Sequence, residues 1–357
     1  MKKKKLKIGL VGCGGMGRWF HVHRYYAHEP RVELVAACDL IPERAQTIVD
    51  EYFPKARTYT DYRELLKDPS IDAIDICTPN HLHSEIAIAA FRAGKHVFCE
   101  KPDAIDARKA AAMRDAAAKA GKLLMVMRNN RFTDAARYLK KFVEDGRAGE
   151  IYAGRCGWQR RRGIPGKGGW FTTKAKSGGG PLIDLGVHMI DLAVWLMGSP
   201  RPVAVSGQTF RKFADAGDVS DSEHSSFGDS VKGGTFDVED LAMGFVRFEN
   251  GAVLQVEFSW ASNIEKERRF AELMGTKAGF AIENAQMKIF SEENGELLDV
   301  VPPGEQRDFG HERNLKNFVD VLLDGAEPCY RPQQGVDMIA ILEGFYRSAR
   351  LGREVRL

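Results

Sequence analysis

The chain has 357 residues, of which 44% are hydrophobic and 28% charged, a composition that excludes wholesale disorder and a fibrous repeat. At roughly 100–200 residues per domain, this length predicts two or three domains. Fifty-two Lys and Arg stand against 49 Asp and Glu, so the net charge of +3 gives no indication of a nucleic-acid or membrane partner. Small molecules are the expected partners.

The N-terminus and the cysteines bear on the cell compartment. The apolar run after the basic residues 1–5 stops at Gly12, which is too short for a signal peptide. No stretch approaches the ~18 uninterrupted apolar residues of a membrane span. The six cysteines lack CxxC spacing, and Cys38, Cys77 and Cys99 lie in or at the end of apolar runs. Reduced, buried thiols in a cytoplasmic protein are therefore expected, and the nine histidines form no recognisable metal-ligand motif.

In the first third of the chain, short apolar runs alternate with helical patterns. Strands are predicted over Lys7–Gly12, Val32–Asp39, Ile71–Pro79, His96–Glu100 and Leu123–Met127. These runs are almost continuously apolar, as expected for a parallel sheet covered by helices on both faces. The pattern predicts an α/β fold with a doubly wound, Rossmann-type domain over residues 1–129.

After Met127 the pattern changes to alternating strands and a few helices. Helices are predicted over Thr133–Gly146, Pro181–Met197, His311–Gly325 and Gln334–Arg350, and strands over Glu150–Gln159, Leu241–Phe248, Val253–Trp260, Arg269–Gly275, Phe280–Glu283 and Met287–Phe290. The pairs Asn250–Gly251 and Asn294–Gly295 indicate hairpin turns. Arg211–Glu239 is predicted to be a long surface loop. Residues 130–357 are therefore assigned to a second α/β domain with antiparallel strands.

The first chemical motif is a glycine-rich turn between a strand and a helix. Gly12 suits the tight turn, Gly14 lets backbone N–H groups approach a pyrophosphate, and Gly17 lets the helix pack closely on the strand. The alternative is a glycine-rich turn that binds nothing. The predicted cofactor contacts here are Gly12, Gly14, Gly15, Met16 and Gly17.

Asp39 ends the second strand, about twenty residues beyond the glycines, as the dinucleotide fingerprint requires. Its carboxylate would accept hydrogen bonds from the adenosine ribose hydroxyls and repel a 2′-phosphate. NAD is therefore favoured over NADP. The nearest following arginine, Arg44, falls inside the next helical pattern. The alternative is that Asp39 is only a turn or capping residue.

Two further motifs end neighbouring strands, at the sheet edge where doubly wound folds bind ligands. One is Glu100-Lys101-Pro102, in which Lys101 would face the crevice and donate to a substrate oxygen. The other begins at Thr78, where Asn80 and His83 would contact the nicotinamide ribose, unless either is a helix cap.

Asp184 and His188 follow a Gly178-Gly179-Gly180 turn and share one helix face at spacing i,i+4. A carboxylate beside an imidazole fixes its tautomer and tunes a general base, which the oxidation of an alcohol requires. A structural ion pair is the plainer interpretation of these two residues alone.

Taken in order, these four motifs resemble those of the Gfo/Idh/MocA family of oxidoreductases, and the resemblance extends over nearly the whole chain. It implies a Rossmann domain followed by an α/β domain whose open, mostly antiparallel sheet mediates assembly into homodimers or homotetramers. It also implies a reaction on a carbinol of a sugar, sugar acid or cyclitol with NAD(P).

Several residue roles follow only from that resemblance. Lys101 matches the catalytic lysine, Asp184 the substrate-binding aspartate and His188 the acid/base histidine. Many relatives have Trp-Arg near the cofactor where this chain has Trp170-Phe171. The further cofactor contacts expected are the residues at the ends of the two strands, Thr78, Asn80, His83 and Glu100, together with Trp170.

Two arginines are additional candidates for substrate binding. Arg160 opens an Arg160-Arg161-Arg162 run that would reach a carboxylate or phosphate of the substrate, or else lies at a solvated strand end or a subunit contact. Arg131 follows the last Rossmann strand and would line the crevice or cap the next helix.

The sequence thus predicts an NAD-dependent dehydrogenase of a sugar or cyclitol hydroxyl, in which Lys101, Asp184 and His188 converge on one carbinol. One alternative keeps the cofactor but hydrolyses glycosides through transient oxidation, elimination and re-reduction. The other is a non-catalytic sensor that retains the nucleotide fold.

Overall fold

The computed structural model describes residues 5–214, 228–302 and 310–357. The described residues form two compact units, the first made of residues 5–128 and 310–336 and the second of residues 129–214, 228–302 and 337–357. The first change of unit falls within one residue of the predicted boundary. The return of residues 310–336 to the first unit differs from the assignment of all of 130–357 to one domain.

The first unit is built on a parallel sheet. Its described residues form six strands in the order β3-β2-β1-β4-β5-β6, and every neighbouring pair is parallel. The strands are β1 (Leu6–Val11), β2 (Val32–Cys38), β3 (Arg57–Tyr59), β4 (Ala73–Ile76), β5 (His96–Cys99) and β6 (Leu124–Val126). The doubly wound fold is confirmed, and five of the strands match predicted ones. The unpredicted β3 is short and carries the exposed Arg57 and Thr58, so it lacks an apolar run.

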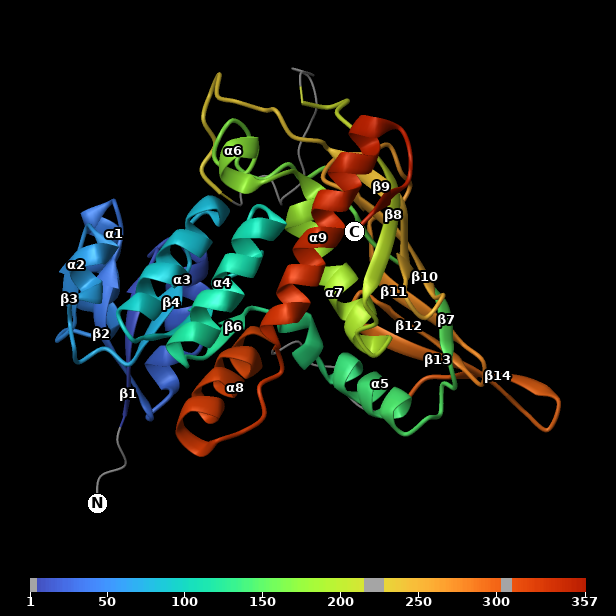
Figure 1. The fold of residues 1–357 in the computed structure, drawn as a ribbon, viewed down its shortest axis with the longest axis horizontal. Helices are drawn as coiled ribbons and strands as arrows, with labels where there is room; N and C mark the ends of the chain where they lie inside the picture. Colours follow the sequence, from blue (N-terminus) through green and yellow to red (C-terminus); the bar gives the residue numbers. More distant parts are fainter. Residues whose placement is uncertain (1–4, 215–227, 303–309) are drawn as a thin grey trace. The chain divides into compact units, whose positions relative to one another are not determined.

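Helices connect these strands and cover the sheet (Figure 1). They are η1 (Met16–His23), η2 (Tyr26–His28), α1 (Pro42–Tyr52), α2 (Tyr62–Leu66), η3 (Asn80–Leu82), α3 (His83–Arg92), α4 (Ala107–Ala120) and α8 (Gly310–Asp324). Local chemistry sets their ends. The Asp106 side chain accepts a hydrogen bond from the backbone N–H of Lys109 at the start of α4 (2.8 Å), and Gly121 ends that helix with φ +60°.

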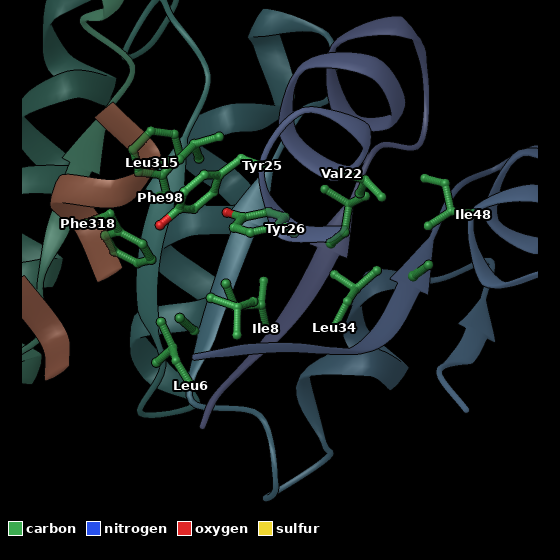
Figure 2. Close-up of a cluster of buried hydrophobic side chains, with 14 of the residues drawn as sticks. Leu6, Ile8, Val22, Tyr25, Tyr26, Leu34, Ile48, Phe98, Leu315 and Phe318 are labelled. Atoms are coloured by element: carbon green, nitrogen blue, oxygen red, sulfur yellow. The ribbon is translucent and has the colours of Figure 1, made fainter. Parts of the chain in front are cut away.

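The core of the first unit explains why residues 310–336 return to it. Leu315, Phe318 and Val319 of α8 are fully buried in one cluster with residues of the sheet. The rings of Phe318 and Phe98 lie 5.3 Å apart, and Figure 2 shows both beside Leu315. The helix thus contributes apolar side chains that complete the core formed by residues 5–128. Burial of such side chains is the main stabilising contribution to a core.

The second unit is built on a larger, open sheet. Its described residues form nine strands in the order β14-β13-β12-β11-β7-β10-β9-β8-β15, and β7 and β10 are the one parallel pair among them. The strands are β7 (Ile151–Gln159), β8 (Pro202–Phe210), β9 (Leu241–Phe248), β10 (Val253–Ser259), β11 (Arg268–Gly275), β12 (Gly279–Glu283), β13 (Gln286–Glu293), β14 (Glu296–Val300) and β15 (Val355–Arg356). The mostly antiparallel sheet is confirmed.

Three of the four predicted helices lie wholly or partly in this unit, and the fourth, His311–Gly325, is α8 of the first unit. The helices of this unit are η4 (Asn129–Phe132), α5 (Asp134–Glu144), α6 (Lys174–Ser177), η5 (Leu182–Gly186) and α7 (Val187–Leu196), and α9 (Pro332–Leu351) passes from the first unit into the second. Among the described residues, one helical segment, Lys174–Leu196, is long and apolar enough to cross a membrane. Its most apolar part is 78% buried inside the protein, as in the core helix of a globular domain. In this unit α7 packs against β7 and β11.

Both predicted hairpin turns are present. Gly251 has φ +86° between β9 and β10, and Asn294 and Gly295 have φ +52° and +82° between β13 and β14. Asn294-Gly295 is a two-residue loop with left-handed backbone at both positions, which favours Asn-Gly, whereas at Asn250-Gly251 only the glycine has a positive φ. The predicted loop Arg211–Glu239 contains no helix or strand in its described parts, 211–214 and 228–239, and the remainder lies outside the described residues.

All six cysteines lie in described stretches and are free thiols. Cys13, Cys38, Cys99 and Cys156 are buried as expected, whereas Cys77 and Cys329 are partly exposed. Burial raises the pKa of Cys38 to about 12, with Asp39 contributing in the same direction. The buried thiols are therefore protonated at neutral pH.

The packing of α8 predicts the effect of truncating its central aromatic residue. Phe318→Ala is expected to lower the free energy of unfolding by about 3–5 kcal/mol, because it leaves a cavity against Phe98 in the first core. Denaturant unfolding monitored by circular dichroism measures this loss. The matched control is Leu297→Ala, which truncates a side chain that is 86% exposed. Equal stability of the two variants would show that α8 contributes nothing to this core.

Candidate active site

The glycine turn of the first unit has the shape of a dinucleotide cradle. Gly12 has φ +98°, and a Cβ there would lie 2.5 Å from the backbone of Cys77. A Cβ on Gly17 would lie 2.3 Å from the Gly12 carbonyl oxygen, so the helix packs on the turn only with glycine here. Gly14 and Gly15 have open space where a Cβ would stand. Gly12 and Gly17 are therefore required by the packing of the turn. Gly14 and Gly15 leave the backbone accessible at the start of η1.

This cradle fits a dinucleotide on two further observations. Thr78, at the end of β4, has a buried hydroxyl without a hydrogen-bond partner among the residues that the structure describes. Backbone at Gly14 and Gly15, at the N-terminus of η1, is open to an anion such as a pyrophosphate. Burying a polar atom without a hydrogen-bond partner destabilises the fold. A bound ligand that forms a hydrogen bond with the Thr78 hydroxyl would account for its burial.

Asp39 lies where the fingerprint requires it, directly after β2. One carboxylate oxygen accepts a hydrogen bond from the backbone N–H of Cys13 (2.8 Å) and the other from that of Ile41 (2.9 Å). The carboxylate is thereby fixed against the glycine turn. Leu40 and Ile41 beside it are 84% and 43% exposed, which leaves apolar surface next to the acid. Arg44 lies inside α1, as predicted.

Lys101 is held in place by its neighbours. Among residues 97–104 every residue except Lys101 is buried. Glu100 accepts hydrogen bonds from His21 (2.9 Å) and from the backbone N–H of Lys101 (3.1 Å), while the Pro102 carbonyl lies 2.7 Å from His83 Nδ1. The loop is thus fixed on both sides of the lysine.

His83 has a different role from the predicted one. Its ring is fully buried, and its two nitrogens lie 2.7 and 2.8 Å from the carbonyl oxygens of Pro102 and Thr78. Burial lowers its pKa, which the two carbonyls oppose. Because both nitrogens face backbone oxygens, His83 joins the loops after β4 and β5, and the expectation that it contacts the nicotinamide ribose is wrong. Asn80 is buried at the start of η3, and its contact with that ribose stays a prediction.

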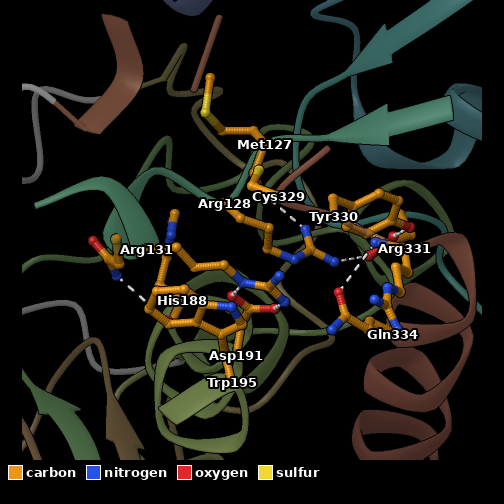
Figure 3. A network of polar contacts seen from close by, with 12 residues as sticks. Met127, Arg128, Arg131, His188, Asp191, Trp195, Cys329, Tyr330, Arg331 and Gln334 are labelled. Carbon is orange, nitrogen blue, oxygen red and sulfur yellow. Dashed lines mark hydrogen bonds and ion pairs between the residues drawn. The ribbon is translucent and has the colours of Figure 1, made fainter. Parts of the chain in front are cut away.

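A second buried network fixes the same loop from the other end. Asp103 accepts hydrogen bonds from the guanidinium of Arg128 and the hydroxyl of Tyr330, each at 2.5 Å, and all three side chains are buried. The Arg128 guanidinium also lies over the Tyr330 ring, 5.2 Å from its centroid (Figure 3). A Cβ on Gly335 would lie 2.0 Å from the Asp103 carboxylate, so α9 begins against this network only with glycine at that position.

In the second unit, Asp184 and His188 lie on a buried helical run. Every residue from 179 to 193 is buried except these two. Asp184 belongs to the π-helical turn η5 and His188 to α7, which follows it directly. Trp260 donates a hydrogen bond from its indole N–H to the Asp184 carboxylate (3.0 Å), and the His188 ring lies 6.0 Å from that of Trp158.

Glu239 fixes the start of this helical run. Its buried carboxylate accepts hydrogen bonds from the backbone N–H groups of Gly180 (3.0 Å) and Leu182 (3.2 Å) and from the hydroxyl of Tyr346 (2.9 Å). Burial raises its pKa, which these donors oppose. A Cβ on Gly179 would lie 1.9 Å from the Tyr346 hydroxyl. The glycine run before Asp184 is therefore required by the packing of Glu239 and Tyr346.

The indole of Trp158 lies between several charged groups of the second unit. The guanidinium groups of Arg160 and Arg269 each lie 5.2 Å from its ring centroid. Arg160 has a buried Nε without a partner in the described part of the chain, and its carbonyl accepts from Ser259 (3.1 Å) and Ser262 (2.8 Å). Burial lowers the pKa of Arg160, which nearby Asp184 opposes. Arg160 is therefore fixed in position with an unused donor, as a ligand-binding residue requires.

The other two predicted residues of this unit have partners of their own. The Arg131 guanidinium makes two bonds to the Asp191 carboxylate, at 2.8 and 2.7 Å, and both side chains are buried beside Trp195 (Figure 3). The predicted role of Arg131 in substrate binding is thus wrong, because its charge is already paired in the protein interior. Trp170 stacks on Phe171 with centroids 3.8 Å apart, and its contact with the cofactor stays a prediction.

His21, Asp75 and Cys77 form a cluster that the sequence did not reveal, because it joins η1 to β4 and the residue after it. Their ligand atoms lie within 4.8 Å of one another. The His21 Nδ1 and Asp75 oxygen are 2.7 Å apart, whereas two ligands of one tetrahedral zinc ion stand roughly 3.3 Å apart at ordinary bond lengths. The His21–Asp75 separation is that of a hydrogen bond, and the second ring nitrogen of His21 bonds Glu100.

Both units match known proteins. Residues 6–128 match the model of an oxidoreductase family with an NAD-binding Rossmann fold, and residues 136–281 match the Gfo/Idh/MocA C-terminal domain. D-glucoside 3-dehydrogenase of Escherichia coli K12 is 32% identical over 358 residues, which cover 100% of this chain and 99% of that protein. Levoglucosan dehydrogenase of Pseudarthrobacter phenanthrenivorans is 32% identical over 85% of this chain and 78% of its own.

Solved structures agree over the whole length. A levoglucosan dehydrogenase in complex with NADH and levoglucosan has a TM-score of 0.85 at 26% identity, with 99% of each chain covered. An aldose-aldose oxidoreductase from Caulobacter crescentus has a TM-score of 0.80 at 25% identity, with 99% of this chain and 100% of that chain covered. The cradle and the sheet domain thus define an NAD-dependent oxidoreductase. The chain belongs to the Gfo/Idh/MocA family.

The geometry of Asp39 predicts the basis of cofactor choice. Asp39→Ala removes a charged acceptor, worth about 1.5–3 kcal/mol, so kcat/KM with NAD is expected to fall roughly 10- to 100-fold. The loss with NADP is expected to be smaller, since the repulsion of a 2′-phosphate disappears as well. Steady-state rates with both cofactors measure the ratio, and Asp50→Ala on the exposed side of α1 is the control. An unchanged ratio would remove Asp39 from the cofactor site.

Proposed function

We propose that this chain transfers hydride between NAD and a secondary alcohol of a sugar or related polyol. Lys101, Asp184 and His188 act on the same substrate in this proposal. The observation that carries it is the partial exposure of these three residues. Each is accessible within a run of buried residues, 97–104 for Lys101 and 179–193 for the other two. A polar side chain that reaches solvent from within a rigid, buried segment is typical of a site that binds and orients a reactant.

The roles of the three residues follow from their chemistry. Bound NAD supplies the acceptor of the hydride. His188 takes the hydroxyl proton as the carbinol is oxidised and returns it in the reverse direction, as a histidine does at neutral pH. Lys101 donates a hydrogen bond to the same oxygen and stabilises its negative charge. Asp184, fixed by the indole N–H of Trp260, accepts hydrogen bonds from substrate hydroxyls.

The second unit offers a suitable surface for a pyranose or cyclitol ring. Trp158 is partly exposed to solvent with its indole near His188, and Arg160 offers an unused N–H donor close by. Aromatic side chains with a few fixed donors and acceptors are the usual composition of a small-molecule site. The printed names of the relatives, glucoside, levoglucosan and inositol dehydrogenases, favour a cyclic polyol as substrate.

The first experiment measures NADH absorbance with a panel of glucosides, anhydrosugars, sugar acids and inositols. Lys101→Ala and His188→Ala are each expected to lower kcat by about 10²–10⁴-fold, the usual contribution of acid–base catalysis. The double variant is expected to lose hardly more than the worse single one, since residues that act as a unit are not additive. Lys119→Ala, on the exposed side of α4, is the control for general effects of losing a lysine.

The other outcomes separate the alternatives. Full turnover by both single variants would contradict the catalytic assignment. Release of sugar from a glycoside without net NADH would favour hydrolysis through transient oxidation. Tight NADH binding without turnover of any compound would favour a non-catalytic sensor.

We also propose that the chain assembles into a homodimer or homotetramer through the large sheet, in a reducing compartment such as the cytoplasm. Free cysteines support the compartment. The face of the sheet that bears Met243, Phe245 and Met274 supports the assembly, since these apolar side chains are 42%, 47% and 37% exposed. An Arg155–Glu272 ion pair on the same face (3.0 Å) gives it the mixed character of a protein interface.

Phe245→Glu tests this assembly, because a carboxylate at the centre of an apolar contact is desolvated without a partner. Light scattering coupled to gel filtration is expected to show a smaller particle for this variant than for the wild type. Tyr138→Glu, at a 41% exposed residue of α5, is the control. A monomeric wild type, or an unchanged particle size in Phe245→Glu, would contradict the proposed interface.

A further inference from the structure

His21 is a buried imidazole in the middle of the first unit that the proposed mechanism does not use. Its side chain is fully buried. Nδ1 lies 2.7 Å from a carboxylate oxygen of Asp75, and Nε2 lies 2.9 Å from one of Glu100. The thiol of Cys77 lies 3.4 Å from Nδ1. The ring is thus enclosed by two acids and a sulfur.

The two bonds determine the charge of the ring. A neutral imidazole has one N–H donor, whereas two carboxylates facing both nitrogens require two. Burial on its own disfavours the charged ring, but Asp75 and the hydrogen bonds raise the pKa of His21 well above its ordinary value. Burial likewise favours neutral Glu100, yet the hydrogen bond and charge of His21 lower the pKa of Glu100 to about 2. The geometry therefore favours the charged ring, which has an N–H donor for each of the two carboxyl groups.

The network joins three parts of the candidate site. His21 belongs to η1, the helix that starts from the glycine cradle, and Asp75 belongs to β4, three residues before Thr78. The second carboxylate oxygen of Glu100 accepts from the backbone N–H of Lys101 (3.1 Å). A continuous chain of hydrogen bonds thus runs from the cofactor-binding helix to the backbone of the proposed catalytic lysine.

Stability alone is a weak explanation for such a network. Replacing a buried ion pair or triad by apolar side chains of similar volume is often neutral or stabilising, because desolvation of the charges opposes their attraction. The neighbouring rings of Tyr26 and Phe98, 6.4 and 5.8 Å away, show that aromatic packing is already available at this place. What the charged network adds is a fixed direction for the Glu100 carboxylate.

We propose that His21 is a positioning residue, which fixes Glu100 and thereby the backbone of Lys101 relative to the helix that follows the glycine cradle. This inference rests on the proposed function for the role of Lys101. It assigns to His21 no contact with substrate or cofactor. The misplacement of a reacting group by about 1 Å lowers a rate by roughly 100-fold, so a bond that fixes the lysine loop has a measurable effect.

Two substitutions at the same position separate positioning from mere packing. In His21→Gln the side-chain N–H₂ reaches the place of Nε2 and keeps the bond to Glu100, whereas in His21→Asn it reaches the place of Nδ1 and keeps only the bond to Asp75. We expect His21→Asn to lower kcat roughly 10- to 100-fold, and His21→Gln to retain most of it. His23→Asn, at the exposed histidine of the same helix, is the control and keeps full activity.

A second readout is independent of turnover. Hydrogen exchange of the peptide that contains Lys101, measured by mass spectrometry, reports the bond between its N–H and Glu100. We expect faster exchange in His21→Asn and wild-type exchange in His21→Gln, with a similar Kd for NADH in both. If the wild type oxidises no polyol, the proposed function fails while this measurement still tests the role of His21. Equal exchange and equal kcat in the two variants would overturn the proposal.

Discussion

The rigid placement of the Lys101 loop is the constraint on which the rest of the candidate site depends. Three independent partners hold it: His21 bonds Glu100, His83 faces the carbonyl of Pro102, and Arg128 bonds Asp103. Each contact is buried, so water competes little with it. These contacts fix the backbone on both sides of Lys101, the one partly exposed residue of the loop.

The second unit solves the same physical problem with a different arrangement. There a helical run carries the reactive side chains, and a buried carboxylate, Glu239, bonds its first N–H groups. The Trp260 indole then orients the Asp184 carboxylate. In both units the candidate site residues are few and partly exposed, and the groups that fix them are buried and hydrogen-bonded.

Much of the fold and part of the site could be predicted from the sequence. Five strands of the parallel sheet and the main helices follow from runs of apolar residues, and both Asn-Gly turns from the need for left-handed backbone. The positions of the glycine turn and of Asp39 were predicted correctly because they depend on local sequence, within a strand, a turn and a helix. Strands β3, β8, β14 and β15 were not predicted, nor was the return of residues 310–336 to the first unit. The short β3 and this return have no local signal.

The errors within the site have one physical cause. His83 and Arg131 are polar residues next to ligand-binding motifs, and local sequence gives no indication that their partners are Pro102 and Asp191. His21 and Trp158 were overlooked for the converse reason. Their importance arises only when Glu100, 79 residues away along the chain, and His188, on another element, are brought beside them. Partners distant in sequence are set by tertiary packing, which a motif does not contain.

The contribution of α8 to the first core has a consequence for biosynthesis. Residues 1–128 leave the ribosome long before Leu315, Phe318 and Val319 exist, so the nucleotide-binding half cannot complete its interior while it is being made. Part of its apolar surface stays exposed until the whole intervening unit has been translated. Domains usually fold one after another from the N-terminus during synthesis. In this chain the first unit completes its core only after the second unit has been synthesised.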